Sequence, residues 1–232
     1  MKKVAILQSS YLPWKGYFDI IHDVDLFIFY DCVQFTKRDW RTRNYFKMEE
    51  KRQLISVPVH GSTEMNINQI KIANQQPWKR KHYNAFKLSY GKCEFFKDYG
   101  YILEDFFVNN NWEYLSDFNQ HCIKEISKIL KIKTEFINSS ELNLTGSKTD
   151  RLIYALKKVK ADLYISGPAA KGYIEPDKFI REGIELKYKD YKGYPEYRQK
   201  GNNFLHEVTI LDLLFNEGEK SSYFIWGWRE EK

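Results

Sequence analysis

Apolar positions near the start of the chain switch between short runs and a helical spacing. Val4 to Leu7 and Asp25 to Tyr30 are short, mainly apolar runs, and between them Gly16 to Val24 carries apolar residues three and four apart. Short runs of this kind are typical of buried strands, and the wider spacing predicts a helix. Strand, helix and strand within about 30 residues form a βαβ unit, whose crossover favours parallel strands.

The second half of the chain repeats this alternation. Strands are expected at Thr134 to Ile137, Asp162 to Ser166 and Glu185 to Tyr188, and helices at Arg151 to Val159, Pro176 to Glu182 and Val208 to Asn216. Ser147, with Asp150 three residues later, is expected to cap the first of these helices.

The middle of the chain has mainly helical spacing. A strand is expected at Leu54 to Val59, followed by helices at Trp78 to Tyr90, Phe95 to Val108 and Leu115 to Leu130. The sequence therefore predicts a single α/β domain over residues 1–232. Its core would be an open, mainly parallel, Rossmann-like sheet, with a helical insertion at about residues 76–131.

Composition narrows the class of protein. Hydrophobic residues make up 43% of the chain and aromatic residues 17%, which excludes a disordered protein. Three cysteines far apart and five histidines without ligand spacing indicate neither disulfides nor a metal site. The net charge of +6 is spread along the chain, which favours a small anionic ligand over nucleic acid.

The termini and the cysteines also suggest a location. The first apolar run is too short for a signal peptide, and no stretch approaches the roughly 20 apolar residues of a membrane span. We expect a cytoplasmic protein without a membrane span, either a monomer or a homodimer, that does not bind nucleic acid.

Ligands of open α/β sheets bind beyond the carboxyl ends of the strands, so the loops there are the first candidates. The loop Gln8 to Gly16 is neither a Gly-x-Gly-x-x-Gly loop nor a P-loop, but it precedes a helix whose free amides could hold a phosphate. Gln8, Tyr11 and Trp14 are candidate substrate-binding residues. The alternative is that the two aromatic residues only pack the start of the helix.

The loop Asp31 to Asn44 combines an acid, an amide, cations and an indole directly after a buried strand. Arginine binds phosphate bidentately, and an indole can stack on a base or a sugar. We therefore consider six of its side chains as substrate-binding candidates: Gln34, Lys37, Arg38, Trp40, Arg41 and Arg43. The alternative is a charged, solvated hairpin.

Other strand ends supply further candidates. Asp31 and His60 are the candidate catalytic bases, and no covalent nucleophile is indicated. Gly167, Lys171 and Tyr173 in the turn after Ser166 offer backbone access, a cation and a hydroxyl. Lys148 precedes the helix expected at Arg151 to Val159 and is expected to line the same cleft. Ordinary helix capping also explains its segment.

Several motifs together resemble the WbqC-like family. They are Tyr-Leu-Pro-Trp-x-Gly-Tyr-Phe at residues 11–18, Val-Gln-Phe-x-Lys-Arg-x-Trp-x-x-Arg-Asn at 33–44, Ser-Val-Pro-Val at 56–59, Lys-Thr-Asp-Arg-Leu-Ile at 148–153 and Thr-Ile-Leu-Asp-Leu-Leu-Phe-Asn-Glu-Gly at 209–218. The segments 78–90 and 164–173 are also similar. The resemblance implies a part in making or decorating a glycan of the O-antigen, lipopolysaccharide or capsule type. It carries over no catalytic residues.

Two hypotheses follow. The first is a transferase that moves an acyl or aminoacyl group to the amine of a nucleotide-linked amino sugar, with an acyl-donor cosubstrate and no tightly bound cofactor. The alternative is a non-catalytic binding or scaffold protein of the glycan assembly machinery. Under the first hypothesis, the candidates of the two N-terminal loops converge partly on one cleft, and Arg38 or Arg41 binds the anionic part of the substrate.

Overall fold

A sheet of five parallel strands, in the order β7-β2-β1-β8-β9, forms the centre of the molecule. The structure is a computed structural model and describes residues 1–229. The strands are β1 (Lys3–Leu7), β2 (Leu26–Phe29), β7 (Glu135–Asn138), β8 (Leu163–Ser166) and β9 (Glu185–Tyr188). Val4 pairs with Leu26 on one side and with Tyr164 on the other. The strand order therefore reverses between β1 and β8, and the predicted open, parallel, Rossmann-like sheet is confirmed.

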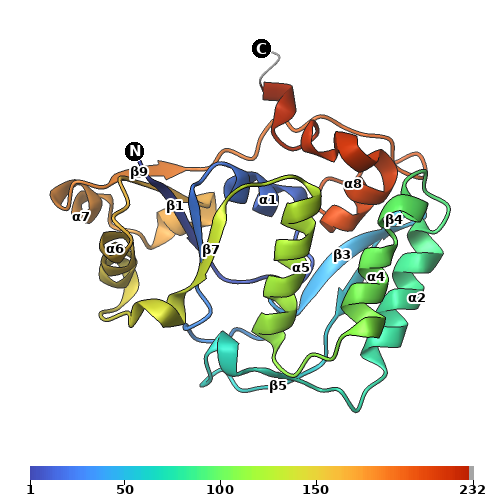
Figure 1. The fold of residues 1–232 in the computed structure, drawn as a ribbon, viewed down its shortest axis with the longest axis horizontal. Helices are drawn as coiled ribbons and strands as arrows, with labels where there is room; N and C mark the ends of the chain where they lie inside the picture. Colours follow the sequence, from blue (N-terminus) through green and yellow to red (C-terminus); the bar gives the residue numbers. More distant parts are fainter. Residues whose placement is uncertain (230–232) are drawn as a thin grey trace.

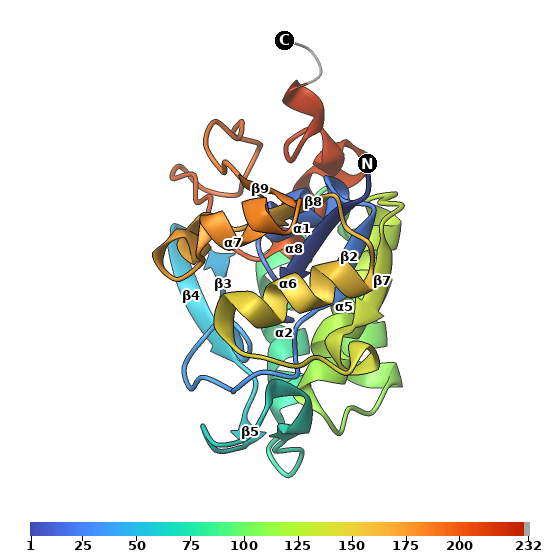
Figure 2. The ribbon, with the colours of Figure 1, turned by 90° about the vertical axis from the view of Figure 1, so that its left-hand side faces the viewer.

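Helices cover both faces of the sheet, because its strands are apolar on both sides. Ala5 and Phe27 face one core, and Val4 and Ile6 face a second core on the opposite side. The first core is covered by α1 (Lys15–His22) and α5 (Leu115–Ile129), and the second by α6 (Lys148–Lys158) and α7 (Pro176–Arg181). Figure 1 shows these two layers on either side of the sheet, and Figure 2 shows α6 and α7 across the nearer face.

Between β2 and β7 the chain leaves the sheet and builds more than helices. It forms two hairpins, β3 (Arg43–Met48) with β4 (Lys51–Ser56) and β5 (Val59–His60) with β6 (Lys71–Ile72). It then forms α2 (Trp78–Tyr90), α3 (Phe96–Tyr99), α4 (Tyr101–Glu104) and a π-helical turn at Asp105–Asn109, before α5. The hairpin β3–β4 and α2 lie beyond α5, on the side away from α6, and β5 lies below α5 in the view of Figure 1.

Three local predictions are confirmed only in part. The helix expected at Phe95 to Val108 is broken into α3, α4 and the π turn, where the Asn110 side chain binds both the carbonyl and the carboxylate of Asp105. The strand expected at Leu54 to Val59 is divided at Pro58, which cannot donate to a ladder. Ser147 precedes α6 but makes no side-chain cap.

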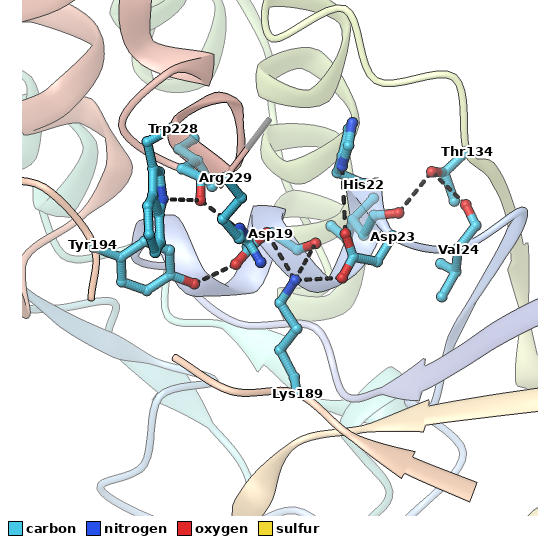
Figure 3. A network of polar contacts seen from close by, with 11 residues as sticks. Asp19, His22, Asp23, Val24, Thr134, Lys189, Tyr194, Trp228 and Arg229 are labelled. Carbon is cyan, nitrogen blue, oxygen red and sulfur yellow. Dashed lines mark hydrogen bonds and ion pairs between the residues drawn. The ribbon is translucent and has the colours of Figure 1, made fainter. Parts of the chain in front are cut away.

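The segment after β9 returns over α1 and leads to α8 (Ile210–Glu217). A buried polar network fixes it there (Figure 3). Asp19 of α1 is fully buried, and its carboxylate contacts Lys189 Nζ at 2.8 Å, Arg229 at 2.5 Å and the Tyr194 hydroxyl at 2.5 Å. Lys189 also pairs with Asp23. Within residues 1–229, no helix is both long and apolar enough to cross a membrane.

Candidate functional site at the carboxyl edge of the sheet

The carboxyl ends of β1 and β2 meet at the side chain of Asp31. Its Oδ1 accepts a hydrogen bond from the Ser9 backbone amide at 2.8 Å, and its Oδ2 accepts one from Gln120 Nε2 at 2.9 Å. Ser9 follows β1, Asp31 follows β2 and Gln120 lies on α5. Three separate elements therefore fix one buried carboxylate next to the point where the strand order reverses.

The surroundings of Asp31 change its acidity. Burial raises the pKa of Asp31 above its ordinary value of 3.8, although the hydrogen bonds from Ser9 and Gln120 and the positive charge of Arg41 oppose this rise. A carboxylate with a raised pKa binds a proton more readily near neutral pH, which is the property of a general base.

A polar cavity of about 170 Å³ borders Asp31 on the side of β7. Its walls carry a second carboxylate, Asp117, whose pKa is also raised by burial and by the charge of Glu113. Most of the other lining residues carry amides or hydroxyls: Asn68, Tyr114, Ser116, Gln120, Asn138, Ser139 and Ser140. This lining suits a small ligand with several hydroxyl or amino groups.

Two arginines at the same edge of the sheet have hydrogen-bond donors that no described protein group uses. Arg41 pairs with Asp39 at 3.0 Å, yet its buried Nε has no hydrogen-bond partner in the described part of the chain. Arg151 of α6 donates to Cys32 Sγ at 3.3 Å, and its buried Nε is likewise without a partner among residues 1–229. Unused guanidinium donors of this kind bind phosphate or carboxylate oxygens.

Gly167 follows β8 on the other side of the reversal point. Its φ of −70° is open to any residue, so backbone conformation does not require glycine here. A side chain would also fit, because the nearest heavy atom to an added Cβ is the Tyr191 hydroxyl at 3.9 Å. A glycine that neither conformation nor packing requires leaves room for a ligand beside the backbone.

The two aromatic candidates of the first loop serve packing. Tyr11 is fully buried, and its hydroxyl is 2.7 Å from His82 Nδ1. Trp14 covers Gly16 so closely that an added Cβ would lie 2.3 Å from the indole. Gln8 remains at the sheet edge, where its carbonyl accepts a hydrogen bond from the Tyr17 hydroxyl at 2.9 Å.

The second loop divides its candidates between two places. Asp31 and Arg41 lie at the sheet edge, whereas Lys37, Arg38 and Arg43 line a separate groove of about 380 Å³ beside β4 and β5. Of the remaining two, Trp40 is half-exposed and packs on Tyr45, and Gln34 donates to the Thr63 carbonyl at 2.6 Å. The ten candidates of the two loops thus occupy a sheet edge, a groove and the core.

The remaining candidates lie outside the Asp31 cavity. His60 is exposed on β5 and binds the Gln75 side chain, so it is not among the groups around Asp31. Lys171 Nζ lies 5.1 Å over the Tyr188 ring, and Tyr173 is exposed near Arg41. Lys148 is exposed at the start of α6 with a left-handed φ of 49°.

Sequence reasoning missed Gln120, Asp117 and Arg151. Gln120 and Asp117 lie on α5, a helix without a strand-end signal, and they reach the edge only because α5 crosses the end of β2. Arg151 lies three residues after Lys148 in the Lys-Thr-Asp-Arg-Leu-Ile motif, but the spacing alone does not show which side chain faces the sheet. Within residues 1–229, no group of three or more His, Cys, Asp or Glu residues could hold a metal ion.

Comparison with known proteins agrees with the motifs. The chain is 37% identical over 227 residues to the uncharacterized protein Rv1507c of Mycobacterium tuberculosis, covering 97% of this chain and 98% of the relative. No solved structure matches it. The model of the WbqC-like protein family matches residues 8–223, which include both N-terminal loops, Gln120, Arg151 and Gly167. This chain therefore belongs to the WbqC-like protein family.

Proposed function

We propose that this protein transfers an acyl or aminoacyl group to the amine of a nucleotide-linked amino sugar, in the biosynthesis of a surface polysaccharide such as the lipopolysaccharide O-antigen. The observation that carries the proposal is Asp31, a buried carboxylate with a raised pKa between a polar cavity and two arginines. The family resemblance supports the choice of a sugar as the substrate.

Each part of this substrate has a counterpart at the edge of the sheet. The guanidinium groups of Arg41 and Arg151, whose hydrogen-bonding capacity is not fully used, would bind the diphosphate, where the strand order reverses. The amides and hydroxyls of the Asp31 cavity would bind the hydroxyl groups of the sugar. Gly167 would let the nucleotide approach the backbone.

The reaction needs a base for the amine, and Asp31 is suited to this role. The amine nitrogen attacks the acyl carbonyl, a C–N bond forms, the bond from the acyl carbon to its carrier breaks, and the amine proton moves to Asp31. Ser9 and Gln120 each occupy one site on the carboxylate, and each oxygen keeps a second lone pair for the substrate. The two hydrogen bonds also fix the carboxylate in place.

The test combines binding with turnover. Thermal unfolding is measured with UDP, GDP, dTDP and their amino-sugar derivatives, because a ligand at 100 times its Kd stabilises the folded state by about 2.7 kcal/mol. The sugar that stabilises best is then incubated with acyl thioesters, and amide formation is followed by mass spectrometry. A non-catalytic binding or scaffold protein would bind the sugar without forming any amide, and that result would reject the transferase.

A further inference from the structure

A second cavity lies apart from Asp31, beside β4 and β5. This basic groove has a volume of about 380 Å³ and shares no lining residue with the Asp31 cavity. Phe35 and Val57, both 2% exposed, contribute apolar surface, together with Leu54 and Val59. Three cations, Lys37, Arg38 and Arg43, also line it.

The charge of the groove is not balanced locally. None of its described lining residues is acidic, and Lys37, Arg38 and Arg43 form no ion pair with any side chain in residues 1–229. The acid next to Arg38 in the sequence, Asp39, is already occupied by Arg41, by the Thr36 hydroxyl at 2.6 Å and by the Trp40 amide at 2.6 Å. Three unpaired cations in one hollow attract an anion.

The backbone at Arg38 supports a binding role. Arg38 has a φ of 57°, in the left-handed region that glycine adopts without cost and that other residues rarely adopt. Its side chain is exposed, so packing does not offset this strain. Strained positions of this kind concentrate at ligand sites.

We infer that the basic groove binds a phosphorylated ligand with an apolar arm. The two guanidinium groups and the Lys37 ammonium take the phosphate oxygens, and Phe35, Val57 and Val59 take the arm. If the proposed function holds, this ligand is the carrier of the acyl group. Phe35 follows Asp31 by four positions, so their Cα atoms lie at most about 14 Å apart, a distance that an arm of that length can bridge.

The experiment titrates the protein calorimetrically with 4′-phosphopantetheine, which joins a phosphate to a flexible arm, and with inorganic phosphate and pantetheine separately. We expect 4′-phosphopantetheine to bind more tightly than either part. Arg38→Gly and Arg43→Gln should each weaken it about tenfold or more, as expected for a lost charge-assisted hydrogen bond. Arg38→Gly should also leave the Tm unchanged or higher, because glycine relieves the left-handed backbone.

A control variant locates the binding. Lys51→Gln removes one exposed charge from the neighbouring β4 and should bind 4′-phosphopantetheine as the wild type does. The inference is overturned if the wild type binds 4′-phosphopantetheine no more tightly than it binds inorganic phosphate. It is also overturned if Arg38→Gly binds 4′-phosphopantetheine as the wild type does, or if Lys51→Gln weakens this binding as much as Arg38→Gly. Binding in the groove without amide formation would reject the transferase and leave the groove assignment standing.

Discussion

Few groups stabilise the ionised form of Asp31, although this carboxylate is buried. It has two hydrogen-bond donors and a nearby arginine, while burial disfavours its charge. A carboxylate that served only the fold would be stabilised by a close ion pair, as Asp19 is. The poor compensation at Asp31 fits a group that must take up a proton.

Replacing Asp31 by asparagine should separate catalysis from stability. Asparagine keeps one acceptor for the Ser9 amide, and Gln120 can turn its amide to accept from the new amino group. We expect amide formation to fall by about 10² to 10⁴, while the free energy of unfolding at neutral pH changes by less than about 1 kcal/mol. Mass spectrometry and urea unfolding measure the two effects. An unchanged rate would exclude Asp31 as the base.

The pH dependence of stability provides a second test of Asp31, because it reports the pKa of this carboxylate. The folded protein holds the Asp31 proton to a higher pH than the unfolded chain, so wild-type stability falls as the pH rises from 3.8 through the folded-state pKa. Asp31→Asn lacks this contribution. The difference in unfolding free energy between wild type and variant should therefore shift in favour of the variant between pH 4 and pH 7, and a constant difference would show that the pKa is not raised.

Gly167 and Gly172 offer a matched pair of substitutions after β8. Neither has a left-handed φ, and an added Cβ meets only the Tyr191 hydroxyl at 3.9 Å in the first case and nothing within 4 Å in the second. Gly167→Leu and Gly172→Leu should both stay within about 0.5 kcal/mol of wild-type stability. Only Gly167→Leu should weaken nucleotide-sugar binding, measured by calorimetry. Equal binding by both variants would place the nucleotide elsewhere.

The sequence predicted individual site residues unevenly. Asp31 was identifiable because it directly follows a buried strand, and Gly167 for the same reason. Gln120 was not identifiable, since its role depends on where α5 crosses the sheet, and that is set by packing between distant segments. For Tyr11 the sequence left ligand binding and packing open, and its burial, with the hydroxyl 2.7 Å from His82 Nδ1, favours packing.

At the scale of elements, the missed hairpin β3–β4 shows what a single sequence lacks. Two residues, Glu49 and Glu50, connect its strands, and Glu49 adopts a left-handed φ of 54°. Such turns usually carry Asn-Gly or Asp-Gly, so the usual turn signal was absent. Most of β4 is exposed, which removed the alternation that marks a half-buried strand. The buried strands of the sheet had no such ambiguity, and all five were predicted.

The contact between α2 and the first loop should make the protein sensitive to acid. Burial lowers the pKa of His82 to about 4 from its ordinary 6.5, so the folded protein binds its proton later than the unfolded chain as the pH falls. The contribution of His82 to the free energy of unfolding is fully present above pH 6.5, and about 3 kcal/mol of it is lost as the pH falls to 4.

The variant His82→Gln isolates this contribution. Glutamine retains an acceptor for the Tyr11 hydroxyl but does not titrate, so the unfolding free energy of this variant should change by about 3 kcal/mol less than that of the wild type between pH 6.5 and pH 4. Chemical denaturation at both pH values measures this difference. Parallel pH profiles would show that His82 does not account for the acid sensitivity.

At the scale of the whole molecule, the network at Asp19 joins segments that are far apart in sequence. Lys189→Met should destabilise the protein by about 3 to 5 kcal/mol, because it leaves the buried carboxylate of Asp19 and the partly exposed one of Asp23 with fewer partners. Lys187→Met, on the exposed face of β9, loses only a surface pair with Glu185 and should cost less than about 1 kcal/mol. Urea unfolding of both variants tests this, and equal losses would show that the network adds nothing to the fold.

The same network constrains synthesis on the ribosome. Arg229 follows Asp19 by 210 positions in the sequence. At about 5 to 20 residues per second, the ribosome adds Arg229 roughly 10 to 40 s after Asp19. Until Lys189 is added the Asp19 carboxylate has neither of its two cationic partners, and until Arg229 is added it has only one, so the first βαβ unit should remain loosely packed. We therefore expect the N-terminal strands to settle late, so that the apolar faces of β1 and β2 stay exposed to chaperones during much of translation.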